Sequence, residues 1–456
     1  MKENKKLWGG RFKKEIDRDF FEFQKSIQYD YSLAEYDIYH SIIHVQALSL
    51  AGILNKQEEE KILTALRQIL AEVKRGTFIP DSDCEDIHSD IQNRVKEKVG
   101  DVALKLHTMR SRNDQVVFDE KMYILNQYIE LSRLLSSLLD AISDKAQAHK
   151  NCYFIGYTHT RRAQVVYFSD YILAYGHMFM RDYERLMHFE DGLKISTGSG
   201  AVAGSPLDFR YYQKAISLSG VVKKHTDEMI SPMDHVASRD FIVEFLSILA
   251  IIQMHLSRLA EDLILYSTTE YDFIDLPEEF CTGSSLMPHK KNPDFLELVR
   301  GYTGRVYGNL VALLTTMKGL PMSYNRDMQL DKEPLFSSID TVKTELSILA
   351  KFISGIALKD ENIKAALKDE CLYATEIVQY LVFKKHVPFK AAHDIVGSLV
   401  RHSEEKKVKI LKMSDKTLFS FHKGLNRKIL SRIMTPFYAV STKYNGKHDL
   451  PGIKLH

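Results

Sequence analysis

Residues 283–294, GSSLMPHKKNPD, place hydroxyl, ammonium and amide groups side by side in one short polar stretch. The groups that could take part in chemistry are those of Ser284, Ser285, Lys290, Lys291 and Asn292. Glycine and proline at this density predict a loop rather than a helix interior. Pro293 is well placed to start the next helix, with Glu297 in its first turn. Because hydroxyls can exchange protons and cations can hold negative charge, this loop is a candidate catalytic segment.

Three further polar segments, HTMRSRNDQ, GYTHTRRAQ and YNRDMQLDKE, carry groups that could bind or protonate an anionic substrate. Their polar side chains of interest are Arg112 and Asn113, Thr158 and His159, and Tyr324, Gln329 and Lys332. Arginine binds carboxylates through two parallel hydrogen bonds, and histidine can carry a proton near neutral pH. On composition alone, HTMRSRNDQ also fits a solvated loop between helices. His159 precedes a helix predicted from Ala163, and a lone histidine is more often structural than catalytic. Together they suit a reaction that moves protons and stabilises an anion derived from a carboxylate.

Two other segments have compositions that could indicate a metal site or a nucleotide site. The run DSDCEDIHSD at residues 81–90 gathers five acids, a histidine and a cysteine, but it matches no EF-hand or H-E-x-x-H spacing. We favour a polar loop that opens a helix, with Asp or Ser as its N-cap. The glycine-rich TGSGAVAG at residues 197–204 lacks a surrounding strand-helix-strand unit, which favours a tight turn between helices. We therefore expect no metal and no cofactor.

The bulk composition describes a folded protein with balanced charge. The chain has 456 residues, of which 45% are hydrophobic, so a large buried core is possible. With 62 basic against 60 acidic residues, the net charge of +2 does not favour nucleic acid or an acidic membrane as a partner. Four widely spaced cysteines indicate reduced thiols, and the N-terminus has no apolar stretch typical of a secretory signal. The most apolar stretch, residues 241–266, contains four charged residues and is predicted to be a buried helix. We expect a cytoplasmic protein.

Long helices must position these loops. No proline occurs between Pro80 and Pro206, and residues 120–148 also lack glycine and carry apolar residues at helical spacing on more than one face. Residues 163–188, 239–266 and 295–317 show similar patterns. Helices of 25 residues span about 38 Å, and several of them together predict a bundle. Gly301, Gly304 and Gly308 share one face, which predicts a close approach of another helix there.

Strand patterns are scarce, so we predict an all-α fold of three mainly helical domains. An N-terminal domain would span residues 1–111, and a central bundle of long helices would span residues 112–362. A small helical C-terminal domain would follow at residues 363–456, opening near the charged stretch LKDENIKAALKDE. The chain has no internal repeat and no low-complexity tract.

The string GSSLMPHKKN resembles the signature of the fumarase/aspartase superfamily of β-elimination lyases. Within it, the chain is most similar to the argininosuccinate lyase family. The supporting stretches are KLWGGRF at 6–12, KLHTMRSRNDQV at 105–116, YTHTRRAQ at 157–164, SYNRDMQLDKE at 323–333 and VPFKAAHDIVG at 387–397. The resemblance covers nearly the whole chain. The sequence departs from the family at His289, where glutamine is usual, and at Thr160 and Arg161, where Leu-Gln is common.

The resemblance implies a fumarase/aspartase-like fold, a homotetramer with active sites shared between subunits, and cleavage of argininosuccinate to arginine and fumarate in arginine biosynthesis. It implies that Ser284 is the general base, His159 the general acid and Glu297 its partner carboxylate. Lys290 and Asn292 would stabilise the aci-carboxylate anion formed when the proton leaves. Contacts with substrate are implied for Ser26, Arg112, Asn113, Thr158, Tyr324, Gln329 and Lys332.

Two alternatives stay open within this fold. One is a sister lyase acting on adenylosuccinate or on a simple aspartate, although the SRND and YNRDMQ segments favour argininosuccinate. The other is a non-catalytic, crystallin-like relative, which the presence of Ser284, His159, Lys290 and Glu297 makes less favoured. A helical scaffold with only a partner-binding role would leave the loop at 283–294 unexplained.

Overall fold

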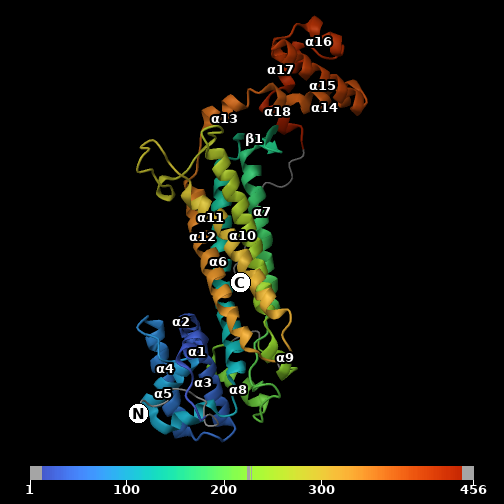
Figure 1. Cartoon of the computed structure of the whole chain (residues 1–456). Coiled ribbons are helices and arrows are strands. Elements are labelled where there is room, and N and C mark those ends of the chain that lie inside the picture. Colours follow the sequence, from blue (N-terminus) through green and yellow to red (C-terminus); the bar gives the residue numbers. More distant parts are fainter. Residues whose placement is uncertain (1–12, 223–225, 227–228, 444–456) are drawn as a thin grey trace. The chain divides into compact units, whose positions relative to one another are not determined.

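The structure, a computed structural model, describes residues 13–222, 226 and 229–443 (Figure 1). The segment at residues 6–12 that contributes to the resemblance lies outside this part of the chain. The described residues are mainly helical, as predicted, with four short strands in two antiparallel pairs. The helices in chain order are α1 (Arg18–Gln24), α2 (Ile27–Asp30), α3 (Ala34–Leu50), α4 (Lys56–Lys74), α5 (Ile87–Val99), α6 (Arg112–Ala148), α7 (Phe168–Gly192), α8 (Phe209–Ser219), α9 (Pro232–Ala237), α10 (Asp240–Ser267), α11 (Asp294–Met317), α12 (Lys332–Gly355), α13 (Asp360–Ala366), α14 (Ala374–Lys385), α15 (Phe389–Lys406), α16 (Asp415–Phe421), α17 (Arg427–Ile433) and α18 (Pro436–Ser441).

The remaining elements are short. The strands are β1 (Tyr153–Thr158), β2 (Arg161–Tyr167), β3 (Ile274–Asp275) and β4 (Ala357–Leu358). The 3₁₀ turns are η1 (Tyr31–Leu33), η2 (Gly100–His107), η3 (Glu278–Phe280), η4 (Arg326–Asp331), η5 (Glu370–Tyr373) and η6 (Ile410–Lys412).

The chain divides into two compact units, each built from three segments. Unit 1 comprises Met1–Ser132, Glu184–Ile251 and Thr303–Lys343, and unit 2 comprises Arg133–Tyr183, Ile252–Tyr302 and Thr344–His456. The long helices α6, α7, α10, α11 and α12 contribute to both units. The three domains expected from the sequence stay a prediction.

In unit 1, α3 carries many buried residues and packs against α4, α5 and α8 (Figure 1). Asn55 and Glu58 form a capping box at the start of α4, which satisfies backbone N–H groups that a helix end leaves unpaired. Asp86 accepts the backbone N–H of Ser89 and caps α5, so the capping role predicted for the run at 81–90 is confirmed. These caps fix where α4 and α5 begin, and α5 begins beside the polar residues described below.

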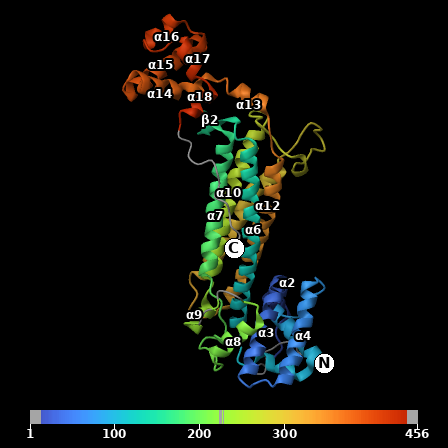
Figure 2. The ribbon, with the colours of Figure 1, turned by 180° about the vertical axis from the view of Figure 1, so that it is seen from behind.

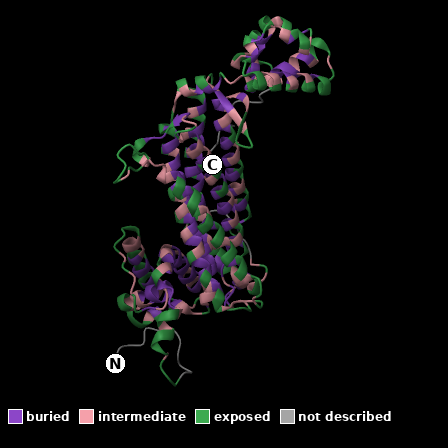
Figure 3. Cartoon of the chain, turned by 45° about the horizontal axis from the view of Figure 1, so that its top comes forward, coloured by how far each residue is buried: buried purple, intermediate pink, exposed green. Residues whose placement is uncertain are grey.

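In unit 2, side-chain hydrogen bonds join the long helices to one another. Tyr175 on α7 donates a hydrogen bond to Asp262 on α10 (2.6 Å), and Lys145 on α6 donates to the carbonyl of Ser354 on α12 (2.9 Å). Buried residues follow the length of these helices (purple in Figure 3). The C-terminal helices α14 to α17 pack on one another in the same unit (red in Figure 2).

Helix α10 is long and apolar enough to cross a membrane by length and composition, but 61% of its most apolar window is buried inside the structure. A core helix of a soluble protein passes the same test, so this observation supports the buried helix predicted for residues 241–266. The four cysteines Cys84, Cys152, Cys281 and Cys371 are free thiols, in agreement with the sequence.

The glycine face of α11 differs from its prediction. A Cβ atom added at Gly301, Gly304 or Gly308 would meet nothing within 4 Å among the described residues, so no described helix packs closely against these glycines. The prediction of close packing is therefore wrong within the single chain. The same helix exposes large apolar side chains, including Leu298 and Val311, each 59% exposed.

Glu345 on α12 is a buried carboxylic acid in unit 2. The Gln253 amide on α10 donates to Glu345 Oε2 (2.7 Å) and to the Val299 carbonyl (3.0 Å), while Glu345 Oε1 has no hydrogen-bond partner among the described residues. Burial disfavours the charged form and raises the pKa of Glu345 to about 8.

The raised pKa of Glu345 predicts a loss of stability with rising pH. Between its ordinary pKa of 4.5 and about 8, the unfolded chain ionises this carboxyl while the folded chain keeps it neutral, so the free energy of unfolding falls across that window. Glu345→Gln is expected to stabilise the protein more at pH 8 than at pH 5, as measured by urea unfolding. Glu261→Gln, at an exposed carboxylate of α10, is the control. An equal effect of Glu345→Gln at both pH values would contradict the assignment.

Candidate active site

The loop at residues 283–294 lies in unit 2 between η3 and α11. Two backbone hydrogen bonds close its base, from Thr282 N–H to the Asn292 carbonyl (3.2 Å) and from Asn292 N–H to the Thr282 carbonyl (2.8 Å). The Asn292 side-chain amide also donates to the Gly283 carbonyl (3.2 Å). The polar loop predicted between long helices is confirmed, and its ends are held together.

Within this loop, the Ser284 hydroxyl faces backbone donors. Ser284 Oγ accepts hydrogen bonds from the N–H groups of Leu286 (3.3 Å) and Met287 (3.1 Å). Ser284 is half-buried, whereas Ser285 is exposed. Two N–H dipoles directed at one oxygen stabilise negative charge on it, so the loop distinguishes Ser284 chemically from its neighbour.

The two adjacent lysines have different surroundings. The Lys291 ammonium pairs with Asp275 (3.1 Å) and donates to the Leu276 carbonyl, which anchors it to the segment before η3. The ammonium of Lys290 is exposed and has no ion pair or hydrogen bond with the described residues. Lys290 is therefore the lysine of this loop whose charge is available for a ligand.

Helix α11 begins at Asp294, directly after Pro293, as the sequence predicts. Glu297 lies in its first turn, and its carboxylate is 3.9 Å from Arg300, which also pairs with Glu261 on α10 (2.6 Å). The positive end of the helix dipole at Asp294 therefore lies beside the loop that carries Ser284.

His159 lies at the tip of a β-hairpin rather than before a helix. Strands β1 and β2 pair through residues 153–167, so the helix predicted from Ala163 is wrong there and begins instead at Phe168 (Figure 2). His159 and Thr160 form the two-residue turn, with φ of 52° and 56°, and both are exposed. Positive φ at both central positions is typical of a type I′ turn and is strained for a β-branched threonine.

The structure does not bring all the implied partners together. No hydrogen bond or ion pair joins His159 to Glu297 within the described part of the chain, and the histidine ring extends from the hairpin into solvent. Thr158 ends β1 and is also exposed.

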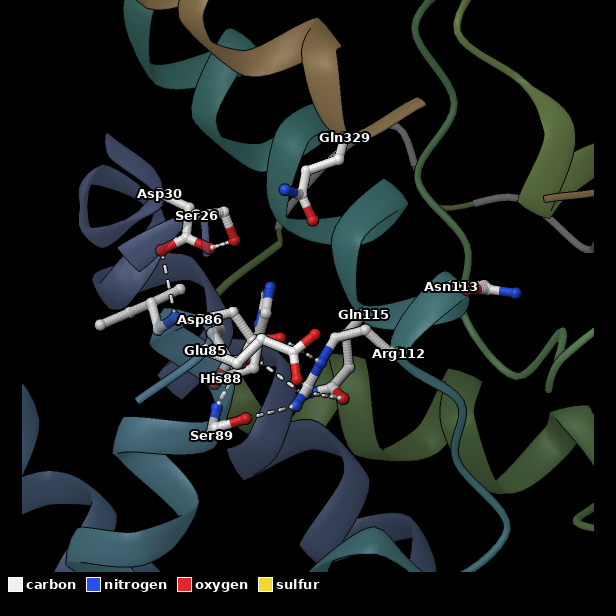
Figure 4. A network of polar contacts seen from close by, with 12 residues as sticks. Ser26, Asp30, Glu85, Asp86, His88, Ser89, Arg112, Asn113, Gln115 and Gln329 are labelled. Carbon is white, nitrogen blue, oxygen red and sulfur yellow. Dashed lines mark hydrogen bonds and ion pairs between the residues drawn. The ribbon is translucent and has the colours of Figure 1, made fainter. Parts of the chain in front are cut away.

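The remaining implied residues lie in unit 1, where several meet in one polar network (Figure 4). Ser26 Oγ donates to Asp30 Oδ2 (2.6 Å), and Asp30 Oδ1 accepts the N–H of Ile87 at the start of α5 (3.1 Å). Burial, reinforced by the nearby charge of Asp86, raises the pKa of Asp30 to about 6. Ser26 is thus held in place by a buried acid that sequence reasoning did not single out.

Arg112, at the start of α6, is held by three partners. Its Nε is 3.0 Å from Asp86 Oδ2, Nη2 donates to Ser89 Oγ (3.2 Å), and Nη1 donates to Gln115 Oε1 (2.8 Å). Burial is the largest influence on Asp86 and works against its ionisation, but the charges of Arg112 and His88 and the hydrogen bonds from Ser89 together outweigh it and hold the pKa of Asp86 below its usual range. The side chain of the neighbouring Asn113 points away from this network in Figure 4, and its Nδ2 lies 3.5 Å from the Ala201 carbonyl oxygen.

Gln329 and Tyr324 come from the segment before α12. The Gln329 amide donates to the Gln24 carbonyl (3.0 Å), which ties η4 to the end of α1. Tyr324 is partly buried, and burial raises the pKa of its hydroxyl. It therefore stays a neutral hydrogen-bonding group at ordinary pH.

Lys332 is enclosed in a buried ion cluster of unit 1. Its ammonium is 2.8 Å from Asp331 and 2.9 Å from Glu120, and its side chain is only 4% exposed. Arg239, also buried, pairs with the same two carboxylates. Burial and the nearby Asp331 raise the pKa of Glu120 to about 7, whereas Lys332 and Arg239 outweigh burial at Asp331 and lower its pKa.

The run at residues 81–90 contributes structure beyond its helix cap. His88 Nδ1 lies 2.9 Å from Asp37 and 3.4 Å from Asp119, and ligand atoms of these three buried residues lie within 4.8 Å of one another. Of the segment predicted to be polar loop and cap, only His88 joins this cluster, while Asp86 and Ser89 hold Arg112. Of its acids, Asp90 pairs with Arg94 within α5 and Asp86 pairs with Arg112, whereas Glu85 pairs with Arg326 of η4 (2.8 Å).

The glycine-rich segment at residues 197–204 forms a turn, as expected. Asp114, the residue after Asn113, accepts from the N–H of Gly198 (3.0 Å) and from the Ser199 hydroxyl (2.9 Å). A Cβ at Gly200 would come within 2.6 Å of the Gly204 carbonyl, so the turn requires glycine there. This segment braces the N-terminus of α6.

Sequence reasoning missed Asp30, Asp86, Ser89 and Gln115 as supports of the implied binding residues. The glutamine of S-R-N-D-Q stands one helical turn after Arg112, at a spacing that places both side chains on one face, which was a usable signal. The contact of Asp30 with Ile87 joins residues 57 apart in the chain, so no local pattern indicates it.

Comparisons with known proteins identify relatives of this chain. Residues 10–308 match the family described as Lyase, and residues 371–441 match the one described as Argininosuccinate lyase C-terminal. The argininosuccinate lyase of Caldanaerobacter subterraneus subsp. tengcongensis is 44% identical over 94% of this chain and 96% of that protein. That of Aquifex aeolicus is 42% identical over 96% of this chain and 94% of that protein.

Solved structures show a similar fold at lower identity. EDDS lyase in complex with formate is 23% identical, with a TM-score of 0.80 over 95% of this chain and 85% of that one. The class II fumarase of Schistosoma mansoni is 16% identical, with a TM-score of 0.74 over 91% of each chain. These structures support the fold alone.

Proposed function

The chain belongs to the argininosuccinate lyase family, and from that premise we propose how its residues divide the chemistry of a carbon–nitrogen lyase. The enzyme cleaves argininosuccinate to L-arginine and fumarate by reversible β-elimination, in arginine biosynthesis. The observation that supports this most strongly is the loop at 283–294, in which a serine hydroxyl accepts two backbone N–H groups and a lysine has no ion pair with the described residues.

Ser284 acts as the general base. A serine hydroxyl is a weak base near neutral pH, so it needs donors that stabilise its alkoxide. The N–H groups of Leu286 and Met287 are directed at its oxygen, and Lys290, in the same loop, has an ammonium without a partner among the described residues. As alkoxide, Ser284 removes the proton from the succinyl carbon next to the carboxylate that becomes the aci-carboxylate.

Lys290 and Asn292 hold the negative charge that this step places on the carboxylate. The N-terminus of α11, which begins at Asp294, adds its positive dipole end. Collapse of the anion breaks the bond to the guanidino nitrogen, and His159 as imidazolium gives that nitrogen its proton. Glu297 is the carboxylate that pairs with His159 in the assembled site.

Ser26, Arg112, Asn113, Thr158, Tyr324, Gln329 and Lys332 bind the substrate. Arg112 supports this role because its Nε forms an ion pair with Asp86, and its hydrogen bonds to Ser89 and Gln115 use two of the four N–H groups on its terminal nitrogens. The other two suit a carboxylate.

The protein assembles as a homotetramer whose active sites are shared between subunits. The glycines of α11 with open space beside them, and the exposed Leu298 and Val311 on the same helix, support a face that another copy covers. Sharing would also supply Glu297 to the His159 of another copy. We place the protein in the cytoplasm, without metal or cofactor, and retain the three-domain division at residues 111 and 362.

Purified protein is expected to release fumarate from argininosuccinate without added metal or nucleotide. The rise of fumarate's ultraviolet absorbance measures this, with adenylosuccinate as the matched substrate control. A flat trace with argininosuccinate and turnover of adenylosuccinate would establish the sister activity instead. No turnover of either substrate by a folded oligomer would favour the crystallin-like alternative.

A further inference from the structure

We propose that Gln115 is a positioning residue that, held by Asp37, sets the orientation of the Arg112 guanidinium for substrate binding. This inference rests on the proposed role of Arg112. It extends the site to a side chain that touches no substrate itself.

The nitrogen and the oxygen of the Gln115 side-chain amide are both hydrogen-bonded, to groups of opposite charge. Nε2 donates to Asp37 Oδ1 on α3 (2.8 Å), and Oε1 accepts from Arg112 Nη1 (2.8 Å). Gln115 is 1% exposed, so water cannot replace either partner. A carboxylate only accepts and a guanidinium only donates, so the amide can satisfy both in one orientation alone.

Asp37 is suited to hold that orientation because it stays ionised. Burial opposes its charge, but the His88 ring, 2.9 Å away, and the Arg110 and Arg112 guanidinium groups outweigh burial. The pKa of Asp37 therefore lies below its usual range, and it remains a pure acceptor at ordinary pH. His88 is fixed in turn between Asp37 and Asp119.

The three contacts of Arg112 define the plane of its guanidinium. Asp86 holds Nε, Ser89 holds Nη2 and Gln115 holds Nη1, so each nitrogen has one partner. Each terminal nitrogen keeps one further N–H, and this pair matches the two oxygens of a carboxylate. Without Gln115 the plane can rotate about the bond to Nε, and the pair no longer faces a fixed direction.

The proposal predicts a loss of substrate affinity that a packing defect would not reproduce. Gln115→Met keeps the volume and removes both hydrogen bonds, and we expect it to raise KM for argininosuccinate about tenfold with a smaller change in kcat. Arg112 binds a carboxylate that ends up in one of the two products, fumarate or L-arginine. The inhibition constant of that product should rise by a similar factor, and the inhibition constant of the other product should change little. Gln253→Met, at a buried glutamine that also donates to a carboxylate, is the matched control and should leave KM unchanged.

Gln115→Glu provides the second variant. Protonated, its carboxyl donates to Asp37 and accepts from Arg112 as glutamine does. Ionised, it repels Asp37 and occupies Arg112 as an ion pair. The ratio of KM in Gln115→Glu to KM in the wild type, measured at the same pH, should therefore be close to one at acid pH and increase as the pH rises.

Arg112→Met separates this proposal from the proposed function. An unchanged KM in Arg112→Met would reject Arg112 as a binding residue. A raised KM in Arg112→Met together with an unchanged KM in Gln115→Met, or a pH-independent KM ratio in Gln115→Glu, would overturn the positioning role alone. Equal weakening of both products by Gln115→Met would also overturn it, because a general loss of structure acts on both.

Discussion

Ser284→Ala is expected to lower kcat by about three orders of magnitude, while KM and the oligomeric state stay close to those of the wild type. The hydroxyl is the group proposed to remove the proton, and alanine has no atom that can replace it. Because Ser284 lies in a loop and its oxygen accepts only two backbone N–H groups, its loss should cost little stability. Initial rates of fumarate release, with the oligomer checked by light scattering, measure the effect.

Ser285→Ala is the matched control for this prediction. Ser285 is the adjacent serine, exposed and in the same loop, so its substitution changes the loop's composition in the same way. We expect a change in kcat of less than about threefold, since Ser285 has no part in proton removal. Near-normal turnover of Ser284→Ala would remove Ser284 as the base, and a large loss in both variants would indicate that the loop's shape matters instead.

Arg239→Met is expected to lower the free energy of unfolding by about 3–5 kcal/mol. The Arg239 guanidinium is fully buried and pairs with Glu120 (3.3 Å) and Asp331. In the variant, Lys332 is the one cation of the described cluster that still pairs with these two carboxylates. Removing one partner of a buried ion cluster leaves uncompensated charge, which costs more than the pair itself contributed. Urea unfolding at fixed protein concentration measures the loss, because assembly makes stability depend on concentration.

Arg300→Met is the control for the buried arginine. Arg300 also forms an ion pair, with Glu261 at 2.6 Å, but its side chain is 44% exposed and that of Glu261 55%. Exposed pairs contribute about 0–1 kcal/mol, so the two variants should differ by several-fold in their effect. Equal losses of unfolding free energy in the two variants would mean that burial does not make the ion pairs of Arg239 contribute more to stability than an exposed pair.

The long helices could be predicted from the sequence because their information is local. Residues 120–148, 239–266 and 295–317 repeat apolar side chains at helical spacing and lie within α6, α10 and α11, apart from the ends. The loop at 283–294 followed from its glycine and prolines. In each case the pattern that predicts the element lies within the element itself.

The β1–β2 hairpin was missed because its turn lacks the usual signal. Its two central positions need positive φ, which Asn-Gly supplies most readily, but here they are His159 and Thr160. The apolar residues of β2 also continue into α7, so one helical pattern fitted both. The strain of Thr160 at positive φ becomes visible only once the backbone is known.

The supports of the binding residues could not be predicted for a different reason. Asp37 meets Gln115 across 78 positions, and Arg239 meets Asp331 across 92. Such pairs depend on how the helices pack, so the spacing of residues within one helix does not indicate them. The glycines of α11 show the converse, since their local pattern predicted close packing and no described helix packs against them.

The most direct test of the central claim is deuterium incorporation when fumarate and L-arginine are combined in D₂O. The enzyme should form argininosuccinate with a single deuterium at the succinyl carbon, as read by mass spectrometry. Ser284→Ala should form it at about a thousandth of the wild-type rate, while Ser285→Ala matches the wild type. Deuterated argininosuccinate formed by Ser284→Ala at the wild-type rate would contradict the assignment of Ser284 as the group that transfers this proton.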